Sequence, residues 1–333
     1  MYTGKYEIAN VVIEVNSIYK TVHEYCRDYK SDKTPDFSIK ITETDIDFER
    51  QKSFREDIAE NRPCREFPDS YLEELAVYRK IADRMTDYNT ILFHGSVVAV
   101  DGQGYLFTAK SGTGKSTHTR LWRELFGERA VMVNDDKPLI HIGKETITVY
   151  GTPYNGKHRL GCNISVPLKA LCILGRSESN TIDSVTKYEV YPILIQQVYR
   201  PEAPEKLKKV LELVDLMAEN TNLYRLKCNM DISSAEISYN KMKGWCIMKL
   251  NKKFLTHDDG KEKILVPTGN AEFSGIVRGN KTAGFIIDCL IDGASEDEII
   301  SKILLKYDVD KDIASRDVKN VIARLKSIGA IDE

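Results

Sequence analysis

The stretch Lys110–Thr117 has the residue types and spacing of a phosphate-binding loop. Its letters are KSGTGKST, between a strand-like run and a helical pattern. Successive backbone N–H groups of such a loop point inward, and the next helix adds its positive dipole end, so nucleotide phosphates bind there. Lys115 is expected to neutralise phosphate charge, and Ser116 to place its hydroxyl on Mg²⁺. The predicted nucleotide-binding residues are Ser111, Gly112, Thr113, Gly114, Lys115, Ser116 and Thr117.

Two adjacent carboxylates, Asp135 and Asp136, follow the next strand-like run. Carboxylates placed there can hold Mg²⁺ and accept a proton from an attacking hydroxyl. The alternative is a solvated turn, since Asn-Asp-Asp is common turn chemistry. His94 could assist the base or steer the substrate, or it could simply be packed. His118, in the first turn after the loop, is expected at the surface.

The elements that must position these residues predict a mixed sheet. The apolar runs Ser96–Val100 and Tyr105–Thr108 are separated by an Asp-Gly turn, which is a hairpin signal. The strand that feeds the loop is therefore antiparallel to its neighbour in sequence. Residues 117–126 predict a helix that ends at Gly127, and residues 130–133 the next strand. The fold class is α/β (α+β).

Three domains are expected from the patterns on either side of the loop. In residues 1–90, Ile8–Val15 and Phe37–Ile41 predict strands and Ser70–Met85 a helix, which indicates a structural or substrate-shaping subdomain. Residues 91–243 form the predicted P-loop catalytic domain. Residues 245–333 contain short strand patterns and then three helical ones, typical of a winged-helix-like module. Those strand patterns lie at 248–250, 254–256 and 263–266, and the helical ones at 281–291, 296–307 and 314–328.

The composition excludes several classes of protein. The 333 residues carry a net charge of −2, which disfavours nucleic acid or an anionic membrane as partner. No apolar run has the length of a signal peptide or a membrane span. The seven cysteines are scattered, which argues against a disulfide scaffold and a zinc site. We expect a cytoplasmic protein.

The chain presents, in order, His94, the hairpin, the loop, the helix, the strand and the paired aspartates. Over roughly residues 90–240, this order resembles that of the HPr serine kinase/phosphorylase catalytic domain. That domain is related in fold to phosphoenolpyruvate carboxykinase. The resemblance implies that His94 and Asp135 serve proton transfer, and that Asp136 and Ser116 serve Mg²⁺. Lys115 completes the predicted catalytic residues. Ala109 stands where the loop usually begins with glycine, and the Glu-x-Arg motif that follows the aspartates in the family has no counterpart after Asp136, which argues against HPr itself as the substrate.

The last 90 residues resemble PqqD, a peptide-recognition element of ribosomal peptide (RiPP) biosynthesis. The similar stretches are Gly279–Gly284, Ile286–Gly293, Glu296–Ile300 and Asp317–Ile331. The resemblance implies that the leader of a precursor peptide adds a strand to the small sheet and lies against a helix. The alternative, a winged helix that binds DNA, would require basic residues along the third helix; those present are diluted by acidic ones.

Together these patterns favour a peptide kinase of RiPP biosynthesis that uses ATP or GTP with Mg²⁺. The precursor peptide is the expected partner, with other maturation enzymes and a homo-oligomer as further options. One alternative is a kinase of a small molecule or a free protein. The other is a non-catalytic, nucleotide-gated peptide adaptor.

Overall fold

A computed structural model describes residues 1–110, 112–144, 146–156, 158–244, 248–258, 260, 262–269 and 273–332. The chain divides into two compact units, Met1–Lys243 and Gly244–Glu333, and each is described here by itself. Within the described residues, none of the helices combines the length and the apolar character needed to cross a membrane.

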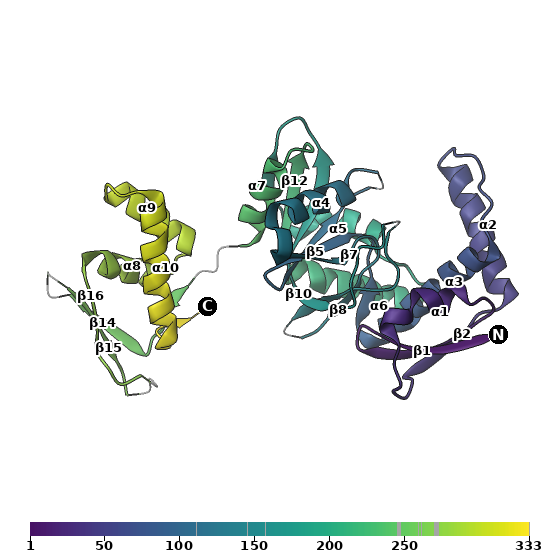
Figure 1. Cartoon of the computed structure of the whole chain (residues 1–333), viewed down its shortest axis with the longest axis horizontal. Coiled ribbons are helices and arrows are strands. Elements are labelled where there is room, and N and C mark those ends of the chain that lie inside the picture. Colours follow the sequence, from purple (N-terminus) through teal and green to yellow (C-terminus); the bar gives the residue numbers. More distant parts are fainter. Residues whose placement is uncertain are drawn as a thin grey trace. The chain divides into compact units, whose positions relative to one another are not determined.

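The first unit begins with a three-stranded sheet in the order β1-β2-β3 (Figure 1). The strands are β1 (Tyr2–Ile8), β2 (Val11–Ser17) and β3 (Phe37–Lys40). The prediction of one strand over residues 8–15 is wrong, because Ala9 and Asn10 turn the chain back. Both have left-handed backbones, with φ of 52° and 61°. Two consecutive left-handed residues form the tight turn of a two-residue hairpin, whose twist matches that of the two strands it joins.

Helices pack beside this small sheet and extend the N-terminal part. They are α1 (Thr21–Tyr25), α2 (Glu43–Ala59) and α3 (Asp69–Met85), with single-turn helices η1 (Arg27–Tyr29) and η2 (Thr86–Tyr88). α3 confirms the predicted helix, and its buried face includes Leu72, Ala76 and Ile81. α2 was not predicted. It begins at a capping box in which the side chains of Thr42 and Asp45 satisfy each other's backbone N–H groups.

The large sheet of the first unit follows the strand order β4-β8-β9-β10-β6-β5-β7, with β12 beside β10 and β11 beside β12. Its strands are β4 (Thr90–Leu92), β5 (Ser96–Val100), β6 (Gln103–Thr108), β7 (Ala130–Asn134), β8 (Leu139–Ile142), β9 (Ile147–Tyr150), β10 (Ser165–Arg176), β11 (Thr181–Ser184) and β12 (Asn222–Cys228). β10 runs parallel to β6 and β12, while β5 is antiparallel to β6 and β7. The predicted hairpin and mixed sheet are therefore confirmed.

Helices cover both faces of this sheet, which is why its strands read as nearly continuous apolar runs. α4 (Lys115–Phe126) and α7 (Ser233–Met242) pack on one face, over a core that includes Val98, Phe107 and Trp122. α5 (Lys187–Gln197) and α6 (Pro204–Glu219) pack on the other, over a core that includes Val97 and Leu106. The short helix η3 (Gly127–Arg129) follows α4.

In its described residues, the second unit combines a small antiparallel sheet with the helices α8, α9 and α10 (Figure 1). The sheet has the order β14 (Phe254–Asp258), β15 (Lys263–Pro267), β16 (Val277–Gly279). The helices are α8 (Lys281–Asp292), α9 (Glu296–Lys306) and α10 (Lys311–Ser327), and β13 (Lys249–Leu250) pairs with β17 (Ile331–Asp332). The N-caps of the three helices are Asn280, Ser295 and Asp310, whose side chains each accept a backbone N–H. The winged-helix-like module is confirmed.

Candidate active site

Three segments meet at one edge of the large sheet. β6 and β7 end there, and β5, which is antiparallel to both, begins there. The Thr108 hydroxyl donates to the carbonyl oxygen of His94 at 3.0 Å, and the Ser96 hydroxyl donates to that of Asp135 at 2.9 Å. The sheet therefore brings the end of the feeding strand, His94 and the paired aspartates together.

The loop before α4 has the backbone that phosphate binding requires. Gly112 and Gly114 have φ of 77° and 125°, a region that disfavours side chains, and α4 begins at Lys115. Ala109 is buried and, unlike the two glycines, is not among the described residues that have positive φ, so its methyl group is accommodated there. Ser111, one of the predicted nucleotide-binding residues, lies outside the described residues. The loop geometry suits backbone N–H contacts with phosphate.

Arg176 supports this loop from the end of β10, a contact that the sequence did not suggest. Its guanidinium donates to the carbonyl oxygens of Gly112 and Thr113, the latter at 3.2 Å. The Thr113 hydroxyl donates in turn to the Lys110 carbonyl oxygen at 2.7 Å. The Thr113 N–H also donates to the Lys110 carbonyl oxygen, at 3.1 Å, so Arg176 and these internal bonds hold the shape of the loop.

The ammonium group of Lys115 lies against the loop and near the carboxylates. Its Nζ donates to the Ala109 carbonyl oxygen at 3.4 Å. Burial lowers the pKa of Lys115, and the negative charge of Asp136 opposes that shift. The charge of Asp136 thus acts on the ammonium group of Lys115.

Asn134 fixes the turn that carries the two aspartates, and the sequence identified it only as part of a turn. Its Oδ1 accepts the backbone N–H groups of Asp136 at 2.9 Å and Lys137 at 2.7 Å. Its Nδ2 donates to the Thr152 hydroxyl at 3.0 Å. The Asn134 side chain is fully buried. The turn is thus built around one amide.

The two aspartates have different surroundings. Asp135 is buried, its Oδ1 accepts the Gly156 N–H at 2.6 Å, and burial raises its pKa. A Cβ at residue 156 would lie 3.0 Å from the Asp135 carboxylate, which explains the glycine there. Asp136 is about one third exposed, and its Oδ1 lies 3.5 Å from His94 Nε2. Asp136 is therefore the carboxylate that faces His94.

His94 is held by its other ring nitrogen. Nδ1 lies 2.9 Å from the Gln197 side-chain oxygen, which fits a neutral ring with the proton on Nδ1 and a lone pair on Nε2. Burial lowers the pKa of His94, and Lys115 lowers it further against the opposing effect of Asp136. A neutral ring with a free lone pair can accept a proton. Gln197 lies 103 residues away in sequence and was not predicted.

The residues present fit Mg²⁺ with few protein ligands. Ser116 is exposed in the first turn of α4, and Asp136 offers carboxylate oxygens at the same edge of the sheet. No group of three or more His, Cys, Asp or Glu residues placed to hold a metal is found in the described part of the chain. Mg²⁺ commonly takes one or two carboxylates and completes its shell with water and phosphate oxygens.

A cavity of about 490 Å³ adjoins the loop on the α4 side. The loop residues Gly112 and Gly114 line it, together with apolar side chains that include Leu121, Leu174 and Met230. A phosphate loop beside an apolar cavity of this volume suits a nucleoside triphosphate, whose base is largely apolar on its faces.

His118 is buried in this region, so its predicted surface position is wrong. Its Nε2 accepts the indole N–H of Trp122 at 3.1 Å and lies 3.1 Å from the Ser238 hydroxyl. Burial lowers the pKa of His118 to about 4. One turn apart on α4, His118 and Trp122 share the face that packs on the sheet.

Comparisons with known proteins match the second unit to a family model and find solved structures of low sequence identity. Residues 262–331 match the family described as Coenzyme PQQ synthesis protein D (PqqD), so the C-terminal part is a PqqD domain. No curated protein matches the chain. Two similar structures are TbiB1 in complex with the TbiA(β) leader peptide and lasso peptide synthetase B1 complexed with the leader peptide. Their sequence identities are 18% and 20%, they cover 25% and 26% of this chain and 94% and 100% of their own, and the TM-scores are 0.23 and 0.24.

A third similar structure is the Hpr(Ser) kinase/phosphatase from Coxiella burnetii. It is 10% identical, covers 46% of this chain and 99% of its own, and has a TM-score of 0.28.

Proposed function

We propose that this chain is a nucleotide-dependent kinase that phosphorylates a serine or threonine of a precursor peptide whose leader is held by the PqqD domain. The observation that carries the kinase assignment is the meeting of the glycine loop, Lys115, His94 and Asp136 at one sheet edge. ATP or GTP is the phosphoryl donor, with Mg²⁺. A non-catalytic adaptor has no need for a histidine with an available lone pair beside the second carboxylate.

Some residues of the site would stabilise negative charge during phosphoryl transfer, and others would move the proton. The loop N–H groups and Lys115 would hold the donor phosphates, and Ser116 and Asp136 would hold Mg²⁺, which would supply positive charge to the transferred group. Asp135 accepts the proton of the acceptor hydroxyl, because burial has raised its pKa toward that of an effective base. His94, kept neutral by burial and oriented by Gln197, assists that proton transfer.

Leader capture is proposed for the second unit because it is a PqqD domain with an open sheet. In the described residues, β14 and β16 each pair with β15 alone, so their outer edges can accept a peptide strand. Such tethering raises the effective concentration of the core peptide near the kinase site to about millimolar. This higher effective concentration gives a reason for the kinase site and the PqqD domain to lie on one chain.

Phosphate transfer to a co-expressed precursor tests the proposal. We expect a phosphate-sized mass increment on the core with the full chain, and none with Lys115→Met. A precursor without its leader should be phosphorylated by the same full chain with a KM about 10²-fold higher.

Equal kinetics with and without the leader would favour a kinase of a free protein. Nucleotide binding without transfer to any precursor would favour the adaptor.

A further inference from the structure

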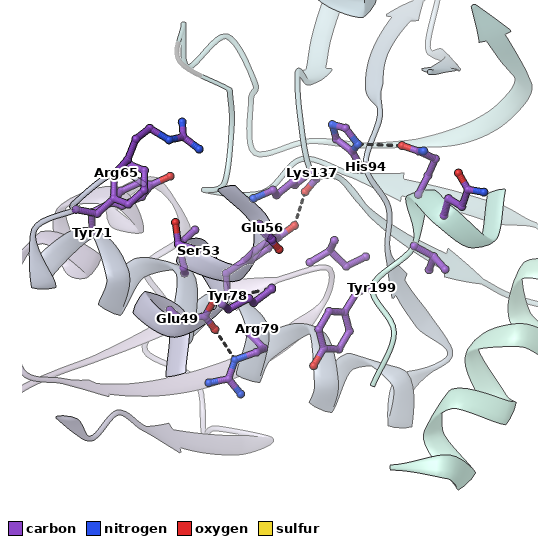
Figure 2. A pocket seen from close by; sticks show the side chains of 17 residues that line it. Glu49, Ser53, Glu56, Arg65, Tyr71, Tyr78, Arg79, His94, Lys137 and Tyr199 are labelled. Atoms are coloured by element: carbon purple, nitrogen blue, oxygen red, sulfur yellow. Dashed lines mark hydrogen bonds and ion pairs between the residues drawn. The ribbon is translucent and has the colours of Figure 1, made fainter. Parts of the chain in front are cut away.

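A second cavity, of about 540 Å³, lies beside His94 (Figure 2). The N-terminal part supplies one wall, through α2, α3 and the residues just before α3. The P-loop domain supplies the other, through His94, Lys137 and residues 196–199. This volume falls in the range of about 300–1,000 Å³ that is usual for ligand sites. Residues 1–90 thus contribute directly to the surroundings of His94.

Hydrogen bonding joins this cavity to the turn that carries the aspartates. The Tyr78 hydroxyl, on α3, donates to the Lys137 carbonyl oxygen at 2.9 Å, as Figure 2 shows. Lys137 Nζ lies 4.0 Å from the Asp136 carboxylate and 5.4 Å from the centre of the Tyr78 ring. A molecule in the cavity would therefore contact the same turn that we assign to the metal and the base.

The cavity shares part of its lining with a hollow on the donor side. Gln196 and Gln197 line both, and the other walls of the hollow include Lys110, Gly112 and Thr113 of the phosphate loop. The two hollows thus share one wall, next to His94. Such an arrangement suits a donor on one side and an acceptor on the other, because in-line transfer needs the two to meet.

The arginines of the cavity are held in close internal ion pairs, and its lysines, Lys52 and Lys137, each lie within 4.0 Å of a carboxylate. Arg65 Nη2 lies 2.8 Å from a carboxylate oxygen of Asp57, whose side chain is fully buried, and Arg79 donates to the nearly buried Glu49. Lys52 Nζ lies 3.9 Å from Glu49. These pairs leave little positive charge for a phosphorylated or carboxylated metabolite.

The remaining wall is aromatic. The rings of Phe67 and Tyr71 pack with centroids 5.1 Å apart, and Tyr78 and Tyr199 also line the cavity. Tyr71 is 41% exposed, so its ring is available to a bound molecule. Aromatic side chains offer large contact area at a low cost in conformational entropy. The wall therefore favours an uncharged, apolar group.

We propose that this cavity, between α2, α3 and residues 196–199, holds the acceptor segment of the peptide. An apolar or aromatic residue next to the acceptor serine or threonine packs against the Phe67–Tyr71 wall, which leaves the hydroxyl beside His94. The proposal rests on the kinase function above and adds its substrate preference: a hydroxyl flanked by an apolar side chain, rather than a charged metabolite.

Short synthetic peptides without any leader test this preference with the full chain. The probes are Gly-Ala-X-Ser-Ala-Gly, with Phe, Leu, Ala, Asp or Lys at X. We expect kcat/KM with Phe or Leu to exceed that with Ala or Asp about ten-fold. Tyr71→Ala, and Ser53→Trp, which fills the cavity from α2, should raise the KM for the Phe peptide about ten-fold and leave the KM for ATP unchanged.

Matched controls lie outside the cavity. Tyr188→Ala removes a tyrosine that is 81% exposed, and Gln51→Trp adds the same bulk to an exposed position of α2. Both should behave as the unaltered chain. Equal rates for all five peptides, together with unchanged kinetics of Tyr71→Ala, would overturn the cavity assignment and leave the kinase function standing.

Amide hydrogen exchange tests peptide binding in the cavity separately from phosphorylation. If none of the peptides is phosphorylated, the kinase function is in question, but the cavity can still be examined with the Phe peptide and ADP present. Slower exchange across residues 65–79 would then support peptide binding in the cavity. Unchanged exchange there would overturn it.

Discussion

Replacement of Asn134 by alanine should damage the use of Mg²⁺ more than the binding of nucleotide. The Asn134 side chain is fully buried and holds the backbone N–H groups of Asp136 and Lys137. Asn134→Ala removes Oδ1, the one acceptor of both N–H groups, and deletes no group that we assign to the nucleotide. The turn with the Asp136 carboxylate should then lose its fixed position.

The expected size of the effect follows from those bonds. A buried N–H group left without an acceptor costs about 1–3 kcal/mol. Two such groups therefore favour rearrangement of the turn by about 2–6 kcal/mol. Loss of residues that orient metal ligands typically lowers metal affinity or activity about 10–100-fold. We expect the Mg²⁺ concentration for half-maximal phosphorylation to rise by that factor.

The assay is a Mg²⁺ titration of phosphorylation at saturating ATP, with ADP affinity measured separately in EDTA. ADP affinity should stay within about two-fold, because the phosphate loop is not altered. Asn222→Ala is the matched control, since that side chain is on an exposed strand position with one long hydrogen bond, 3.4 Å, to Lys169. A folded Asn134→Ala protein with an unchanged Mg²⁺ requirement would refute the role of Asn134.

Two further predictions concern histidine. Burial lowers the pKa of His94, so kcat/KM should be constant near pH 7 and fall as the pH drops through that lowered pKa; a pH profile of His94→Asn should lose the part of this acid limb due to His94 and keep the part due to Asp135. The pKa of His118 is about 4 in the folded chain, against about 6.5 when unfolded. Protons then bind the unfolded chain more tightly, so His118 should lower stability progressively from pH 6.5 toward pH 4, by roughly 3 kcal/mol at most. Urea unfolding at several pH values should show a shallower decline for His118→Leu; an equally steep decline would contradict it.

The phosphate loop and its hairpin could be predicted because their signals are local. The Asp101-Gly102 turn has φ of 51° and 78°, as a two-residue hairpin requires, and the helix begins within two residues of its predicted start. The error at His118 was avoidable. His118, Leu121 and Trp122 lie at the spacing of one buried helical face, which the histidine's polarity obscured.

Other parts of the site depend on contacts that no local pattern contains. α2 escaped prediction because its buried residues include Glu49 and Asp57, so that its inner face is polar and held by arginines from elsewhere. Gln197 reaches His94 across 103 residues of sequence. Polar burial and distant partners are both invisible to hydrophobic periodicity.

The β5–β6 hairpin has a consequence for how the site assembles during folding. It joins His94 to the phosphate loop through about twenty residues of chain, so this half of the site closes a short loop and should form early. The cavity beside His94 instead unites α2 and α3 with residues 196–199, across more than a hundred residues. That half should be completed late. Substitutions in α2 and α3 can therefore change which peptide is accepted while the nucleotide half still folds as before.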